Sequence, residues 1–155
     1  MVDTRFIVQK KCFPVVLEMR DEKTLNGSVF LHFAKDESGY PETPADLVND
    51  HSRFIVFDEE QKGISFIGKD SILRLIYQRG ELQEPDAVEN FSASVCITMN
   101  DKCELHGDVS ALLPEEHARL FDYLNREDEL FITVADTENN FVLANKDFIN
   151  KVTTQ

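Results

Sequence analysis

Residues 15–29 show the strand-like alternation of hydrophobic and other side chains most clearly. A period of two is typical of a β-strand with one buried face. A three-residue loop at the centre of this segment predicts a hairpin in which Leu17 faces Leu25 and Val15 faces Gly27. In this register the apolar side chains of both strands lie on one face of the hairpin.

The same pattern returns in the second half of the chain, where residues 95–109 match residues 15–29 at six of 15 positions. A second match, at a slightly shorter offset, relates Lys69-Asp70 to Lys146-Asp147. Two blocks in the same order and apolar phase indicate a tandem duplication. We therefore expect a first repeat over residues 1–77, a linker over 78–90 and a second repeat over 91–155.

Each repeat is expected to continue with a short helix and three more strands. Thr43 and Pro44 suit the start of the first helix, and Pro114 suits the start of a second one that ends near Asn125. The second helix should bury an apolar face formed by Ala118, Leu120, Phe121 and Leu124. The strands are predicted at 53–58, 63–68, 71–77, 129–135, 140–144 and 148–152. Phenylalanines on these strands, such as Phe57, Phe66 and Phe131, are expected in the core.

Four positions are interpreted as structural. Gly27 and Gly107 lie inside strands, where a missing side chain indicates a strong bend or a close approach of two backbones. Gly68 and Asn145 begin tight connections before the last strand of each repeat, and both residue types tolerate a positive φ there.

The run V-x-L-x-M-x-D-x-x-x-L-x-G-x-V resembles the first signature of Sm-like proteins, a strand–turn–strand with a glycine in a strongly bent second strand. Residues 66–73 resemble the second signature, and residues 143–149 repeat it more weakly, with Asn145 in place of the glycine. The element order is also similar to that of small bacterial Sm-like proteins of unknown function with a helix before the third strand. The resemblance implies a mainly β (α+β) protein with short helices, built from two tandem bent five-stranded barrels.

The resemblance implies the barrel but not the RNA site of the family. The loop that carries the base-binding Asp and Asn in RNA-binding Sm proteins is replaced here by residues 35–52 and 110–128. The basic residue beside the glycine of the second signature is matched only loosely, by Lys69 and Lys146. Sm-like proteins join the fourth strand of one copy to the fifth of the next, so a fused pair could make this contact internally. The outer edges would remain, and a closed ring of fused pairs is one outcome.

The charge of the chain favours a protein partner over nucleic acid. The formal net charge is −13, divided into −3 for residues 1–77 and −10 for residues 78–155. Nucleic-acid binders usually present a basic face, and the longest basic cluster here is Lys10-Lys11. No apolar run is long enough for a membrane span, and the short apolar patch near the N-terminus does not suit a signal peptide. We expect a cytoplasmic protein with no membrane association.

The sequence predicts no catalytic residues, metal site or cofactor. It contains no dinucleotide, P-loop, zincin or nucleophile-elbow motif. The three cysteines have no CxxC spacing, the predicted register separates Cys96 from Cys103, and the four histidines are interpreted as surface residues. Lys69, Asp70, Lys146 and Asp147 are the repeated polar points. They are interpreted either as turn residues or as a binding site on two equivalent repeats.

The main hypothesis is a non-catalytic interaction or regulatory protein that binds protein partners or assembles with itself. The alternative is an Sm-type RNA-binding protein in which Lys69 and Lys146 contact phosphate. A third hypothesis, a small-molecule binder or enzyme, would require a deep pocket with convergent polar groups.

Overall fold

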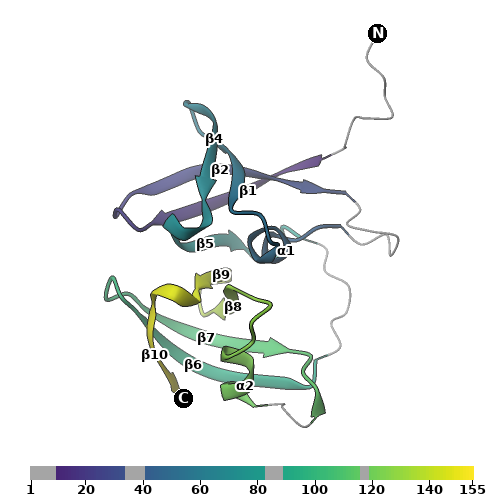
Figure 1. The fold of residues 1–155 in the computed structure, drawn as a ribbon, viewed down its shortest axis with the longest axis vertical. Helices are drawn as coiled ribbons and strands as arrows, with labels where there is room; N and C mark the ends of the chain where they lie inside the picture. Colours follow the sequence, from purple (N-terminus) through teal and green to yellow (C-terminus); the bar gives the residue numbers. More distant parts are fainter. Residues whose placement is uncertain (1–9, 34–40, 83–88, 116–118) are drawn as a thin grey trace.

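The computed structural model describes residues 10–33, 41–82, 89–115 and 119–155. These residues form ten strands and two short helices (Figure 1). In the first half they are β1 (Lys10–Met19), β2 (Thr24–His32), α1 (Pro44–Asn49), β3 (Phe54–Glu59), β4 (Gly63–Gly68) and β5 (Ile72–Gln78). In the second half they are β6 (Phe91–Met99), β7 (Glu104–Ala111), α2 (Leu120–Leu124), β8 (Phe131–Asp136), β9 (Asn140–Asn145) and β10 (Ile149–Thr154).

All ten strands belong to one antiparallel sheet in the order β10-β6-β7-β8-β9-β5-β1-β2-β3-β4. Within each half the fifth strand pairs with the first, and the first four follow in sequence. The mainly β class predicted from the sequence is therefore confirmed. The sheet is open, however, and the described residues show no closed barrel: β4 and β10 are the two edges.

Both hairpins have the register that their sequences predict. Leu17 pairs with Leu25 and Val15 with Gly27, and Ile97 pairs with Leu105 in the second half. The turns repeat as well, because the equivalent residues Glu22 and Lys102 both have a φ of 72°. The local sequence is thus sufficient to set the pairing in each hairpin.

At Gly27 and Gly107 the backbone of the neighbouring strand lies too close to leave room for a side chain. A Cβ atom on Gly27 would overlap the carbonyl oxygen of Asp58, and one on Gly107 would overlap that of Ala135. The close approach predicted for both glycines is confirmed, and it lets β2 and β7 bend onto the next strand.

The two helices differ in how far they follow the prediction. In α1, the Thr43 hydroxyl accepts a hydrogen bond from the Asp46 amide, and the Asp46 carboxylate accepts one from the Thr43 amide, which completes a capping box. The second helix begins at Leu120 rather than at Pro114, although it ends before Asn125 as predicted. Ala118 lies outside the described residues.

Two of the predicted core aromatic residues are on the surface. Phe57 and Phe131 are fully buried, but Phe66 is 72% exposed on the edge strand β4. Phe121 is 75% exposed, because Tyr123 takes the buried position of α2. The helical turn from Leu120 to Leu124 is too short to bury more than one side of its surface.

Each half of the sheet surrounds its own hydrophobic core. The first core contains Phe13, Leu17, Phe57 and Leu75, and the second contains Val95, Ile97, Met99 and Tyr123. The first core also includes two side chains of the second half, Phe131 and Leu143. The contact between the halves is therefore part of a core, and Figure 1 shows β5 and β9 at the centre of the molecule.

Candidate assembly interface

The pairing of β5 with β9 joins the two halves into one sheet. Leu75 pairs with Leu143 and Tyr77 with Phe141, and the ladder extends from Arg74↔Ala144 to Gln78↔Asn140. This is a pairing between the fifth strand of the first half and the fourth strand of the second, the internal contact that the resemblance to Sm-like proteins implies for a fused pair. We call these two strands and the side chains that cover them the internal joint.

Apolar side chains of the second half fill the first core at the internal joint. Phe131 and Leu143 have no exposed surface, and Phe141 packs beside them with its ring centroid 5.4 Å from that of Tyr77. Full burial of one large apolar side chain contributes about 1.5–3 kcal/mol. The joint is thus stabilised by side-chain burial as well as by the backbone ladder.

Arg74 connects both halves through two carboxylates. Its guanidinium donates to Glu18 on β1 at 3.1 and 3.2 Å, and to Asp101 in the β6–β7 turn at 3.1 and 2.7 Å. Both contacts are bidentate, the strongest geometry for an arginine–carboxylate pair. Burial alone would lower the pKa of Arg74, but the hydrogen bonds to Asp101 and Glu18 outweigh it and raise the pKa. The hydrogen bonds that Asp101 accepts from Arg74 lower the pKa of the Asp101 carboxyl.

Two asparagine side chains bond between the halves at one end of the internal joint, where β5 begins and β9 ends. Asn145 is fully buried and donates to the carbonyl oxygen of Ile72 at 2.9 Å. Asn49 on α1 donates to the carbonyl oxygen of Phe131 and accepts from its amide, at 3.1 and 2.8 Å. These bonds satisfy backbone groups where the strands end, which a buried interface requires.

The two edge strands of the sheet correspond to the two strands of the internal joint: β4 is the counterpart of β9, and β10 is the counterpart of β5. Neither edge strand has a partner on its outer side. The alignment that relates Lys69 to Lys146 also relates Phe54 to Phe131, Ile64 to Phe141 and Phe66 to Leu143. Phe131 and Leu143 are fully buried, whereas Phe54, Ile64 and Phe66 are 61%, 57% and 72% exposed. We call these three residues the β4 patch. It lies on one face of β3 and β4, because Phe54 pairs with Gly68 and Val56 with Phe66.

The second core is less complete than the first at the β10 edge. Ile149 and Val152 are only partly buried, whereas their counterparts Ile72 and Leu75 have no exposed surface. Ala93 is also only partly buried. The chain therefore has an apolar patch at one sheet edge and an uncovered core boundary at the other.

The predicted site residue Lys69 is buried in the first half. Its ammonium group donates to the Asp50 carboxylate at 2.6 Å and to the Asp50 carbonyl oxygen at 3.1 Å, at the C-terminal end of α1. Burial would raise the pKa of Asp50, but the bond from Lys69 and other hydrogen bonds lower it. Asp70, its predicted partner, lies in the short 3-10 turn Lys69–Ser71 and is exposed.

Lys146 has the equivalent place in the second half. Its ammonium group donates to the carbonyl oxygens of Arg126 and Leu124, at 2.6 and 3.4 Å, at the end of α2. Burial lowers the pKa of Lys146. The Asp147 amide donates to the Asn145 side chain at 3.0 Å, so Asp147 belongs to the turn. The four residues thus hold the helix ends and turns, and both ammonium groups are directed to protein oxygens.

Gly68 and Asn145 do not have the positive φ that was predicted. Their φ angles are −69° and −71°, because each precedes a 3-10 turn from an extended backbone. Asn145 is instead required for its amide, which reaches across the internal joint. At the free edge the same position is Gly68, where no strand is present to accept such a bond.

Two features of the structure were not predicted from the sequence. The first is the place of Arg74, which the pairing of β5 with β9 brings near Asp101. The second is the pair of Cys96 and His106, which the predicted register of Val95 with Gly107 places directly opposite each other. The register was thus a signal for the second feature.

Comparisons with protein-family models, with curated proteins and with solved structures find no significant match for this chain. Among the described residues, no helix has the length and apolar character needed to cross a bilayer.

Proposed function

We propose that this protein is a non-catalytic interaction module of two Sm-like repeats that assembles head to tail with copies of itself. The observation that carries the proposal is the internal joint, whose two halves recur unpaired at the outer edges. In the proposed contact, β4 of one copy pairs with β10 of the next. An exposed strand edge offers a row of unpaired backbone groups for such pairing.

The internal joint supplies the register of the proposed contact. If β10 and β4 pair as β5 and β9 do, each observed pair has an equivalent between two copies. The pair of Leu75 and Leu143 becomes Val152 and Phe66, and the neighbouring pair becomes Lys151 and Ile67. The bulge at the start of the fifth strand supports the transfer, since it falls between Glu18 and Met19 in the first half and after Ile149 in the second. The two fifth strands, β5 and β10, therefore have the same irregularity at the same place, so β10 can offer the next copy the edge that β5 offers β9.

Apolar complementarity supports a second copy as the occupant. The β4 patch would cover the partly buried Ile149 and Val152 of the next copy, as Phe131 and Leu143 cover the first core within the chain. Burial of the exposed Phe66 side chain alone would contribute about 2 kcal/mol. Both partially covered surfaces would be buried by a single contact.

The charges at the two edges also support a contact between two copies. The counterpart of Arg74 is Lys151, and the counterpart of Asp101 is Asp21. Lys151 is exposed on the β10 edge, and Asp21 lies in the exposed β1–β2 turn of the half that contains β4. In the proposed contact these two charges would take the places of Arg74 and Asp101.

Repetition of a head-to-tail contact produces a ring if the rotation closes, or a filament if it does not. The resemblance to Sm-like proteins favours a ring of fused pairs. The same strand order in both halves, with a helix between the second and third strands of each, supports the duplication.

Light scattering coupled to size-exclusion chromatography over a range of protein concentrations tests the proposal. We expect the mass of the wild-type protein to exceed that of one chain, and salt to favour assembly because it screens the repulsion between chains of net charge −13. Phe66→Lys should give a monomer, since it places a charge in the centre of the contact. Phe121→Lys is the matched control, because Phe121 is equally exposed but lies on α2.

A cross-link tests the register. In a protein whose three native cysteines are serines, the pair Phe66→Cys and Val152→Cys should form disulfides between chains upon oxidation, because directly opposed positions have the required spacing. The pair Phe121→Cys and Val152→Cys should not. A wild-type protein that remains monomeric at its highest soluble concentration would contradict the proposal, as would an oligomer that Phe66→Lys leaves intact.

A further inference from the structure

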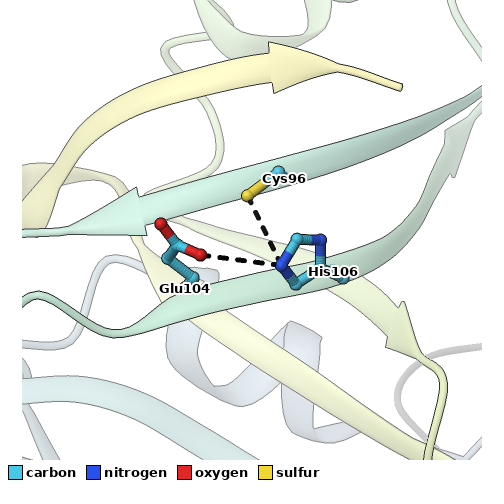
Figure 2. A group of neighbouring side chains, drawn as sticks. All are labelled: Cys96, Glu104 and His106. Atoms are coloured by element: carbon cyan, nitrogen blue, oxygen red, sulfur yellow. Dashed lines mark hydrogen bonds and ion pairs between the residues drawn. The ribbon is translucent and has the colours of Figure 1, made fainter.

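Three potential metal ligands lie on one face of the β6–β7 hairpin. Cys96 and His106 are directly paired across the two strands, and Glu104 lies two positions before His106 on the same face of β7. Figure 2 shows the three side chains directed toward a common point above the hairpin. The thiol, an imidazole nitrogen and a carboxylate oxygen all lie within 4.8 Å of one another.

Two of the three spacings between these atoms are close to those of a tetrahedral zinc site. The Cys96 sulfur is 3.7 Å from His106 Nε2, and this nitrogen is 3.8 Å from Glu104 Oε2. Tetrahedral Zn²⁺ with usual bond lengths to sulfur, nitrogen and oxygen separates such ligand atoms by about 3.3–3.6 Å. The two observed distances exceed this range by a few tenths of an ångström at most, which side-chain rotation can supply without movement of either strand.

The ring nitrogen of His106 that faces away from the cluster has a side-chain amide beside it. Nδ1 lies 3.1 Å from Nε2 of the Gln155 amide, and the imidazole Nε2 is the nitrogen directed to Cys96 and Glu104. Metal at Nε2 places the imidazole proton on Nδ1, where the oxygen of the Gln155 amide can accept it after the amide rotates. This contact would hold the ring in the orientation that coordination needs.

The donor set selects among metals by its chemistry. A thiolate, an imidazole and a carboxylate together suit Zn²⁺, whereas Mg²⁺ and Ca²⁺ prefer a set composed of oxygens. Binding forms a metal–sulfur bond and releases the thiol proton to solvent. The thiolate and carboxylate then balance the two charges of the ion, and a water molecule completes the coordination at the open side.

We propose that Cys96, Glu104 and His106 bind one Zn²⁺ ion on the surface of the β6–β7 hairpin. The site is independent of the proposed assembly, because its three ligands come from a single hairpin of one chain. It differs from the sequence-based expectation of no metal because the ligands converge only after the hairpin has formed.

Titration of the full-length protein with Zn²⁺ alone, followed by calorimetry, tests the proposal. We expect one ion per chain and an affinity at least about tenfold lower for Cys96→Ser and for His106→Gln. Cys103→Ser is the matched control, since this free cysteine lies in the same hairpin but outside the cluster, and its affinity should stay within about twofold of wild type.

Titration with Co²⁺ gives a second readout that depends on the sulfur ligand. The wild-type protein and Cys103→Ser should develop a thiolate-to-cobalt charge-transfer band, and Cys96→Ser should not. Because the three ligands are at the surface, far-ultraviolet circular dichroism should show that all variants fold. The proposal is overturned if the folded wild-type protein binds no Zn²⁺, or if Cys96→Ser retains the affinity or the band.

Discussion

Replacement of Arg74 by methionine tests whether the contact between the two halves is stabilised by its charges. The side chain is only 4% exposed, and it donates four hydrogen bonds to two carboxylates at 2.7–3.2 Å. Methionine preserves most of the apolar volume but none of the donors. Glu18 and Asp101 would keep their negative charges with no cation beside them.

The magnitude follows from the exposure of the two carboxylates. Loss of one partner from a buried ion pair costs about 3–5 kcal/mol. The Glu18 and Asp101 side chains are 34% and 29% exposed, so water replaces part of what is lost. We therefore expect Arg74→Met to reduce the free energy of unfolding by about 2–4 kcal/mol, a large share of the usual total of a domain.

Urea denaturation followed by circular dichroism measures this loss, at a protein concentration low enough for the chain to be monomeric. Lys151→Met is the matched control, because Lys151 is the counterpart of Arg74 in the second half and is exposed. A surface substitution of this kind should change the free energy of unfolding by less than about 0.5 kcal/mol. Equal effects of the two substitutions would refute the reasoning.

Two further predictions concern the bend of the strands and the response to acid. Gly107→Ala should destabilise the protein by about 2–3 kcal/mol in the same urea assay, because the new methyl group meets the Val134 side chain at 2.8 Å as well as a backbone oxygen. In the control Gly63→Ala the new methyl group has free space, and the only cost is the strain of an alanine at a φ of 91°. A comparable loss from both would contradict the close-approach argument. The Asp101 carboxyl has a lowered pKa in the folded state, so its contribution to stability is present at neutral pH and is lost as the pH falls below its ordinary value of 3.8. Thermal denaturation from pH 7 to pH 2 should show a smaller acid-induced decrease for Asp101→Asn than for wild type, and an unchanged decrease would exclude Asp101 as a contributor.

The hairpins could be predicted from the sequence in detail because their stability is local. The apolar face of residues 15–29 is consistent with one register only, and a shift by one residue would expose Leu17 and Leu25. The capping box of Thr43 and Asp46 is local for the same reason. The cysteine–histidine pair was also within reach, since it follows from the register of a single hairpin.

Whether the side chains at equivalent apolar positions of the two halves are buried or exposed could not be predicted in this way. Phe66 and Leu143 occupy the same place in two similar segments, yet one is exposed and the other is fully buried. Local sequence fixes the face of the strand on which each side chain lies. It does not specify whether another strand will cover that face, which depends on the position of the strand in the completed sheet.

The sequence by itself determined the order of the elements, the hairpin registers and the close contacts at Gly27 and Gly107, because each depends on neighbours within one half of the chain. Only the tertiary structure decided that the halves share a single open sheet, that Arg74 lies between Glu18 and Asp101, and that Asn145 bonds across the joint. The contacts of Arg74 with Asp101 and of Asn145 with Ile72 link residues of different halves, and their free energy is gained only when β5 and β9 meet.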